Sequence, residues 1–288
     1  MSQAHRALVA LFIMTACWGA TFPFIHQAVH DCSPTLFAII RNSIASVALL
    51  PIVISRFKRT TRIMIWHALI LGILNGFGNV AQTSGLQTIT ASSSAFITAI
   101  SVILVPFFMP LLKLDRLRLI DIIAALITLF GVFVLTQSQF TDQWQGNAWT
   151  LACALSYAIY ITSLSKFTQH NHDILLLVFY QLVISALFPL CALPFESSYL
   201  SSTATLWNAV LFCGLIGTSV GLLLQNFYQR FISAATAAII YAFEPIFASI
   251  FAFWLIQEEI TRHTIIGGTI ILAGFLLSQS LRQDKHAN

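Results

Sequence analysis

Glu244 is the residue whose position in this sequence most favours chemistry, because it lies in the middle of a long hydrophobic segment. An ionised carboxylate at such a depth costs about 3 kcal/mol on insertion scales, so it is rare there without a function. Pro245 follows directly and removes a backbone donor, which weakens a helix at that point. Tyr241 lies one turn earlier on the same face. We expect Glu244 to bind a substrate cation or a proton; the alternative is a protonated glutamic acid that only hydrogen-bonds a neighbouring helix.

Polar side chains recur at helical spacing in two other hydrophobic segments. They are Asn75, Asn79 and Gln82 in one segment, and Ser94, Thr98 and Ser101 in the next. Lipid cannot satisfy these groups, so both stripes should face other helices, water or a ligand. For the hydroxyl stripe we favour hydrogen bonds between helices. For the amide stripe we favour a cavity lined by water or ligand.

One cation and several aromatic residues also lie inside hydrophobic segments. Arg41 is about a third of the way into its segment, where it either reaches the lipid headgroups or faces a cavity as the partner of an anion. Trp18, Tyr157 and Tyr160 join Tyr241 as candidate cavity residues. Aromatic faces attract organic cations, although ordinary packing is an equally good interpretation.

Sequence motifs for other chemistry are absent. The chain has no Walker A motif, no H-E-x-x-H, no G-x-S-x-G and no clustered set of cysteines and histidines in its sequence. We therefore expect no enzymatic activity, no metal and no cofactor. Four histidines lie near segment ends and are interpreted as interfacial: His26, His30, His67 and His263.

The elements that must position these residues are transmembrane helices. Of the residues, 58% are hydrophobic and 8% are charged, against about 25% charged in soluble domains. Segments of about 20 apolar residues match a hydrocarbon core of about 30 Å, and the absence of period-two alternation argues against a barrel. We predict ten helices, over residues 7–25, 34–54, 64–83, 89–112, 119–136, 146–165, 174–192, 205–225, 233–256 and 263–281.

The Lys and Arg residues divide unequally between the two sides of such a bundle. One set of loops holds Arg6, Arg56, Lys58, Arg59, Arg62, Lys113, Arg116, Arg118, Lys166, Arg230, Arg282 and Lys285. The opposite set holds only Arg262. Cytoplasmic loops are enriched in Lys and Arg, so we expect a bacterial-type inner-membrane protein with both termini in the cytoplasm. The net charge of +4 is then a topology signal and requires no nucleic-acid partner.

The two halves of the sequence resemble each other. A shift of 143 positions places Gln82 on Gln225 and Ala99 on Ala242, with about a quarter of residues 82–136 identical. We divide the chain into a first repeat, 1–138, and a second, 139–288, each with five helices. An odd number inverts the second copy, and inverted repeats are typical of secondary transporters with a substrate site between the halves.

Several motifs resemble the EamA-type family of the drug/metabolite transporter superfamily. The resemblance rests on Trp18–Phe22 (WGATF), Ala91–Ala99, Ala234–Pro245, Glu258-Glu259, Gly131 and Gly274. It implies ten helices and the export or exchange of small metabolites. The fourth helix departs from the pattern: Val102 stands where a proline is expected and Asp115 replaces a glutamate, which leaves open where that helix bends.

Together these features predict a secondary transporter that moves a small metabolite, amino-acid-like or an organic cation, by alternating access. Proton-coupled export is one mode left open, as are the oligomeric state and the alternative of a non-transporting membrane enzyme or assembly factor. The expected partners are the lipid bilayer and a small-molecule substrate. The candidate substrate-binding residues are Trp18, Arg41, Asn75, Asn79, Gln82, Thr98, Ser101, Tyr157, Tyr160, Gln225, Tyr241 and Glu244.

Overall fold

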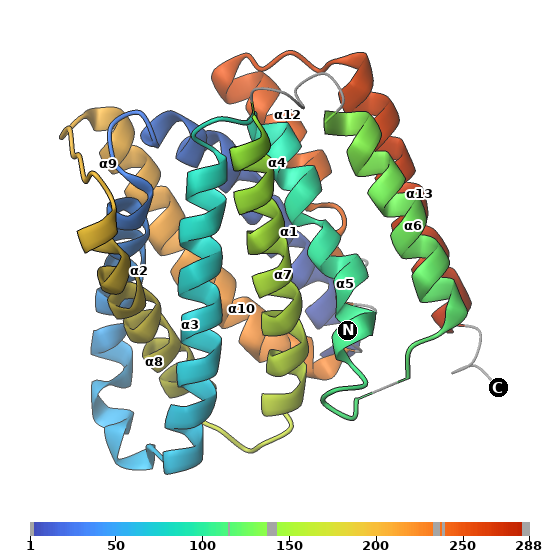
Figure 1. Ribbon diagram of the computed structural model, residues 1–288. Helices are drawn as coiled ribbons and strands as arrows, with labels where there is room; N and C mark the ends of the chain where they lie inside the picture. Colours follow the sequence, from blue (N-terminus) through green and yellow to red (C-terminus); the bar gives the residue numbers. More distant parts are fainter. Residues whose placement is uncertain (1–2, 115, 137–142, 233–236, 238–239, 284–288) are drawn as a thin grey trace.

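The computed structural model describes residues 3–114, 116–136, 143–232, 237 and 240–283, and within them the regular structure is helical. The helices lie side by side as a bundle (Figure 1). Among the described residues, the one β contact is an isolated bridge between Cys32 and Leu200. The prediction of an all-helical protein is therefore confirmed.

Helices follow one another closely along the chain. The part before residue 137 contains α1 (Gln3–Ala28), α2 (Pro34–Val53), the 3₁₀ turn η1 (Ile54–Arg59), α3 (Arg62–Gly85), α4 (Ala91–Thr98), α5 (Ile100–Phe108) and α6 (Leu119–Thr136). The part after residue 142 contains α7 (Trp144–Phe167), α8 (Ile174–Leu187), η2 (Phe188–Phe195), α9 (Ala204–Leu211), the π-helical η3 (Phe212–Val220), α10 (Gly221–Tyr228), η4 (Gln229–Phe231), α12 (Glu244–Ile256) and α13 (Arg262–Gln283).

Many of these helices are long enough to cross a bilayer. Among the described residues, seven helical stretches have the length and apolar composition of a membrane span. They are His5–Ala28, Pro34–Arg59, Arg62–Gly85, Ala91–Phe108, Trp144–Phe167, Ile174–Phe195 and Ala204–Phe231, with two shorter apolar helices at Leu119–Gly131 and Glu244–Ile256. The molecule is thus built as a multi-pass membrane protein.

Burial follows the pattern expected for a protein surrounded by lipid. Large apolar side chains on the outside are freely exposed, for example Trp254 at 73%, Val47 at 65% and Trp66 at 62%. Polar side chains such as Asn42 and Gln181 are fully buried within the bundle. Water cannot satisfy polar groups in the hydrocarbon region, so they gather inside.

Side-chain caps define several helix starts. The hydroxyls of Thr61, Thr90 and Thr203 accept hydrogen bonds from backbone N–H groups in the first turns of α3, α4 and α9. Glu258 adds a second cap to α4, because its carboxylate accepts from Ala91 N at 3.0 Å and from Ser92 N at 3.2 Å. Capping oxygens satisfy donors that a helix cannot satisfy itself.

Two of the spans are interrupted halfway. Ala99 separates α4 from α5, and Val102 N there bonds to Ala99 O at 3.1 Å, three residues back. A turn at residues 242–243 precedes α12, which begins at Glu244. The bend that the sequence left open in the fourth helix thus lies at Ala99, three residues before Val102.

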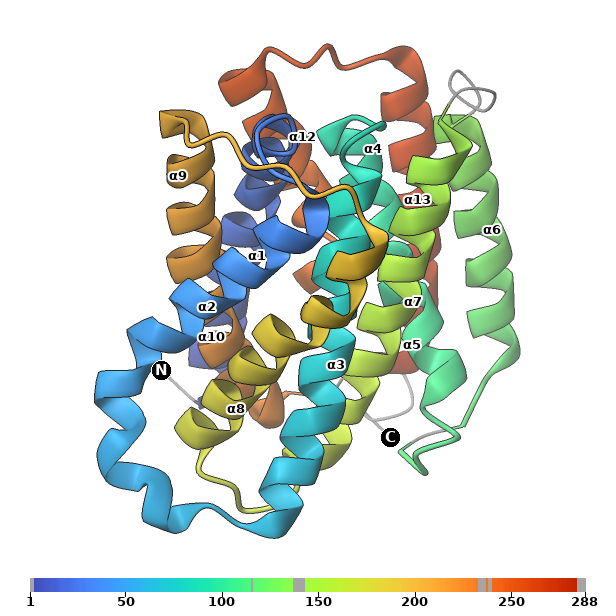
Figure 2. The ribbon, with the colours of Figure 1, turned by 60° about the vertical axis from the view of Figure 1, so that its left-hand side comes forward.

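The connections between helices lie at two ends of the bundle. We call the end with the α12–α13 connection the upper end, and the end with the η1–α3, α5–α6 and α7–α8 connections the lower end (Figures 1 and 2). Eight of the 14 Lys and Arg residues lie at the lower end, in η1, at the start of α3, in the α5–α6 connection and at the end of α7, whereas the α12–α13 connection leads to Arg262. The helices α6 and α13 pack against each other at one side of the bundle (Figure 1).

Candidate functional site: a central polar cavity

A polar cavity lies among the helices and encloses about 690 Å³, counting the space open at its mouth. All twelve residues that the sequence singled out line it. They come from α1, α2, α3, α4, α5, α7, α10 and α12, and Tyr241 comes from the helical residues just before the turn at 242–243. The cavity is also lined by Thr21, Ala99, Val102, Ile161, Gly217, Thr218 and Leu222.

Arg41 faces this cavity from α2, which decides between the two orientations left open by the sequence. Its side chain is buried, and Nε donates to the hydroxyl of Thr218 at 2.6 Å. The Thr218 hydroxyl in turn donates to Cys213 O at 2.7 Å, five residues earlier, within the π-helical stretch η3. The buried Nη1 of Arg41 has no hydrogen-bond partner among the described residues. Arg41 therefore presents a positive charge and a free donor inside the bundle.

Glu244 supplies a carboxylate to the same cavity. It is the first residue of α12, and Pro245 follows in the first turn, where its missing N–H costs no helical hydrogen bond. The Glu244 carbonyl and Ala248 N pack against Gly19 of α1, where an added Cβ would come within 3.0 Å and 2.8 Å of them. In the part of the chain that the structure describes, Glu244 forms no ion pair with Arg41. Both side chains line one cavity.

The amide stripe of α3 lines the cavity and also bonds to neighbouring helices. Asn75 Nδ2 donates to Ser185 Oγ at 3.0 Å, and Asn79 Nδ2 donates to Asn42 Oδ1 at 3.3 Å. Tyr157 OH donates to Asn79 Oδ1 at 3.0 Å. Asn75 and Asn79 therefore bond to neighbouring helices and also border the cavity.

The aromatic residues are held in defined positions. Trp18 Nε1 donates to Gly217 O at 2.7 Å, and the Trp18 ring lies 5.7 Å from that of Tyr241. Tyr241 OH donates to Gln229 Oε1 at 3.0 Å, and Tyr160 OH donates to Gln181 Oε1 at 3.0 Å. Because the polar atom of each ring is hydrogen-bonded to a protein group, the rings hold fixed positions in the cavity wall.

Some cavity-lining atoms have no protein partner. Within the described residues, Thr98 Oγ1 and Gln225 Oε1 are buried without a hydrogen bond, as is the Nη1 of Arg41. Buried polar groups are nearly always hydrogen-bonded to protein or water, so each such group calls for an explanation. An unpartnered donor and two acceptors that border a cavity suit a hydrated or ligand-binding site.

Sequence reasoning did not single out every residue of the site. Thr21 lies one turn from Trp18 and donates to its carbonyl at 2.7 Å, and Gly217 supplies the carbonyl that holds the indole. Thr21 is part of the WGATF motif, so its spacing from Trp18 was a usable signal. The role of Gly217 depends on a backbone carbonyl, which side-chain patterns do not reveal.

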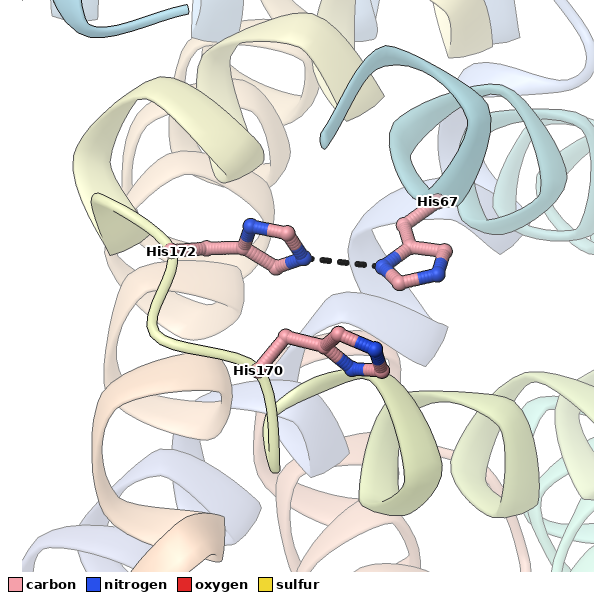
Figure 3. Close-up of side chains that lie close together, drawn as sticks. All are labelled: His67, His170 and His172. Carbon is pink, nitrogen blue, oxygen red and sulfur yellow. Dashed lines mark hydrogen bonds between the residues drawn. The ribbon is translucent and has the colours of Figure 1, made fainter. Parts of the chain in front are cut away.

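Three histidines form a cluster outside this cavity. His67 of α3 lies beside His170 and His172 of the α7–α8 connection (Figure 3). The sequence contains no clustered Cys/His motif, and the fold brings these three histidines together. The sequence signal was the H-x-H spacing of His170 and His172.

The whole chain can be compared with known proteins. The family model described as "EamA-like transporter family" matches twice, over residues 5–137 and 144–279. The chain belongs to the EamA-like transporter family. An "Uncharacterized transporter" of Archaeoglobus fulgidus is 28% identical over 276 residues, which cover 94% of this chain and 83% of the relative. The "Uncharacterized transporter YoaV" of Bacillus subtilis is 23% identical over 287 residues, covering 95% and 96% of the two chains.

A solved crystal structure gives an independent view of this EamA-like fold. It superposes with a TM-score of 0.71 and covers 96% of this chain and 98% of its own, at 19% identity. At that identity the likeness concerns the fold alone. The family and the named relatives indicate a membrane transporter, which agrees with the function class predicted from the sequence and with the resemblance to EamA-type proteins.

Proposed function

We propose that this EamA-like protein is a secondary transporter for a small metabolite with opposite charges, such as an amino acid, with an organic cation as the second choice. The observation that carries the proposal is the presence of Arg41 and Glu244 in one cavity without an ion pair between them. A buried charge is costly unless it is paired, so two unpaired opposite charges in one cavity suit a ligand that pairs with both.

The cavity offers each end of a zwitterion a suitable surface. A carboxylate would take the free Nη1 donor of Arg41, since guanidinium groups bind carboxylates through directed hydrogen bonds. An ammonium group would take Glu244, beside the rings of Trp18 and Tyr241. Aromatic faces attract cations, which would keep the ammonium end oriented.

Alternating access requires two bodies that move around the site, and we infer an inverted repeat of residues 1–138 and 139–288 with five spans each. The double match of the family model supports it. So do four pairs of cavity residues that are related by the shift of 143 positions: Asn75 and Thr218, Gln82 and Gln225, Thr98 and Tyr241, and Ser101 and Glu244. In each pair both members line the cavity.

Reciprocal contacts between the halves support the same symmetry. A Cβ on Gly78 would lie 2.5 Å from the Tyr157 ring, and one on Gly221 would lie 2.5 Å from Nε1 of Trp18. Gly221 is Gly78 shifted by 143 positions, and an offset of 139 positions aligns the first helices of the two halves and places Trp18 on Tyr157. Each half thus places an aromatic residue of its first helix on a glycine of the other half.

The helices α6 and α13 add a second reciprocal pair of contacts. Gly131 packs against Ile271, and Gly274 packs against Thr128. The same shift converts one contact into the other. The interruptions at Ala99 and at residues 242–243 also correspond, and broken helices beside the substrate site are typical of secondary transporters.

The orientation in the membrane follows from the charges at the two ends of the bundle. The lower end contains eight of the 14 Lys and Arg residues, and loops enriched in these residues are cytoplasmic. We infer ten spans in an inner membrane with both termini on the cytoplasmic side.

We propose that Glu244 couples transport to protons. A substrate ammonium group and a proton would compete for the one carboxylate, so the binding of either would release the other. In this mechanism the protonated and ionised forms of Glu244 belong to different steps of the transport cycle.

Counterflow in proteoliposomes tests the proposal. Vesicles loaded with an unlabelled amino acid should accumulate the labelled one, and Glu244→Gln should remove the pH dependence of this flux while the protein stays folded. Glu259→Gln, in an exposed loop, is the matched control and should behave as wild type. A membrane enzyme or assembly factor would give no counterflow with any solute. An unchanged pH profile in Glu244→Gln would mean that Glu244 is structural and that the site is formed by Asn75, Asn79 and Gln82.

A further inference from the structure

The lower end of the bundle holds three imidazoles that the transport site does not use. The ligand nitrogens of His67, His170 and His172 all lie within 4.8 Å of one another. His67 comes from α3, and the other two come from the connection between α7 and α8 (Figure 3). The three residues therefore bring together parts of the chain about a hundred positions apart.

The arrangement of the rings is close to that of a metal site. His67 Nδ1 lies 2.8 Å from His172 Nε2, whereas two nitrogens bound tetrahedrally to one zinc ion at about 2.1 Å lie about 3.4 Å apart. The His170 ring is 4.8 Å from that of His67 and 5.6 Å from that of His172. Shifts of about 1 Å would let all three nitrogens reach one ion.

The surroundings hold the cluster in place. The His67 ring stacks on Phe167 at 3.9 Å with an interplanar angle of 3°. The backbone N–H of His172 donates to His170 O at 2.8 Å, which sets the turn that brings both rings to the same side. Asp173 follows directly and pairs with Arg56 at 3.1 Å and Arg59 at 3.3 Å, which anchors the end of the connection to η1.

Protonation of these residues also suits a metal. The 2.8 Å contact needs one ring nitrogen to donate and the other to accept, which neutral rings satisfy. A neutral imidazole is the form that binds a metal ion.

We propose that His67, His170 and His172 bind one divalent transition-metal ion of the zinc class and thereby fasten the α7–α8 connection to α3. Imidazole ligands select zinc, copper and nickel over magnesium and calcium. Three histidines with an open fourth position are a known zinc arrangement, and the exposure of His170 leaves that position to water. The ion would join the first half of the chain to the second at the lower end.

Cobalt(II) and zinc(II) titrations of the detergent-purified protein, prepared with a purification tag that contains no histidine, test this site. We expect saturable binding of one ion per chain, a visible absorption spectrum of tetrahedral cobalt, and a raised Tm with ZnCl₂ but not with MgCl₂. His170→Ala and His172→Ala should each weaken zinc binding about tenfold or more, since even outer-shell changes at metal sites cost about 10- to 100-fold.

His263→Ala is the matched control, because His263 is exposed and lies at the start of α13, outside the cluster. It should bind zinc as wild type does. His170 is exposed, so its variant should fold, and size-exclusion profiles check this. The site is refuted if wild type binds no zinc, if both cluster variants bind as well as wild type, or if MgCl₂ stabilises as much as ZnCl₂.

Discussion

Arg41 of α2 donates a 2.6 Å hydrogen bond from Nε to the hydroxyl of Thr218, which lies 177 residues later in η3. The hydroxyl in turn donates a hydrogen bond to Cys213 O, five residues back, as the wider π-helical turn allows. Thr218 therefore binds the guanidinium through Nε, and Nη1 has no hydrogen-bond partner among the described residues. The direction of the Arg41 charge depends on this local departure from the α-helix.

Replacement of Arg41 should therefore test the anion end of the site. Arg41→Lys keeps the charge but loses the bond to Thr218 and the fixed second donor. We expect about a tenfold loss of affinity, or about 1.4 kcal/mol, for the amino acid that gives counterflow, and a larger loss in Arg41→Gln. Competition in the counterflow assay measures both. Arg262→Gln, in the upper loop, is the control; equal affinities in all four proteins would remove Arg41 from the site.

Close packing of Trp18 on Gly221 predicts a steric effect. A Cβ at Gly221 would lie 2.5 Å from Nε1 of Trp18 and displace the indole from Gly217 O. Overpacking of this kind costs about 1–3 kcal/mol, so Gly221→Ala should lower the Tm in detergent. Gly78→Ala should behave alike because its Cβ would meet the Tyr157 ring. Val220→Ala, at a 43% exposed position, is the control, and a Gly221→Ala Tm no lower than that of Val220→Ala would contradict the packing argument.

The cap on α4 predicts that removing one side chain from the loop after α12 lowers the stability of the protein. Glu258→Ala leaves Ala91 N and Ser92 N without their carboxylate, and lost caps cost about 0.5–2 kcal/mol. Thermal unfolding should show a lower Tm. The neighbouring exposed Glu259→Ala supplies the control; an equal change in both variants would mean that loop charge, rather than capping, is responsible.

The Asp173 ion pairs predict a particular pH dependence of stability. Burial alone would raise the pKa of Asp173, but the hydrogen bond and charge of Arg56, the backbone N–H of Leu176 and the hydrogen bond from Arg59 outweigh it and hold the pKa below its usual 3.8. The folded pKa is then lower than the unfolded one. The resulting stabilisation is present above 3.8 and is lost as the pH falls through the folded pKa.

Asp173→Asn removes this titration. The Tm difference between wild type and variant should be constant from neutral pH to about pH 4 and should shrink below it. Scanning calorimetry across this range measures the difference. Glu259→Gln should show no comparable difference. A Tm difference between wild type and Asp173→Asn that grows as the pH falls would contradict the lowered pKa of Asp173.

Topology can be tested without transport. Reporter fusions after Gln139 and after Glu196 should both read as non-cytoplasmic, and a fusion after Lys166 should read as cytoplasmic. These expectations follow from ten spans and from the unequal Lys and Arg content of the loops. A cytoplasmic signal after either Gln139 or Glu196 would break the ten-span arrangement.

Much of the cavity was predictable because a single rule governs it: polar side chains at helical spacing inside apolar segments must turn inward. That rule located Asn75, Thr98 and Glu244. It could not orient Arg41, because a long side chain at that depth reaches either the headgroups or the interior, and the choice depends on Thr218 in another helix.

Other features depend on relationships that sequence spacing does not contain. The interruption at Ala99 has no proline to mark it, and the π-helical turn of η3 follows from a hydroxyl–carbonyl bond rather than from composition. The histidine cluster unites His67 with two residues of a distant connection. The cluster is a tertiary contact between segments that look ordinary on their own, whereas the other two features are local changes of helix geometry.

The carboxylate of Glu258 has a mechanical consequence. It belongs to the loop after α12, yet it closes the start of α4, so the two interrupted helices beside the cavity share one joint at the upper end. A movement that opens that end must either carry α4 and the α12 loop together or give up two charge-assisted hydrogen bonds. The parts coupled at the upper end therefore come from both ends of the chain, because α4 lies before residue 137 and Glu258 lies after residue 142.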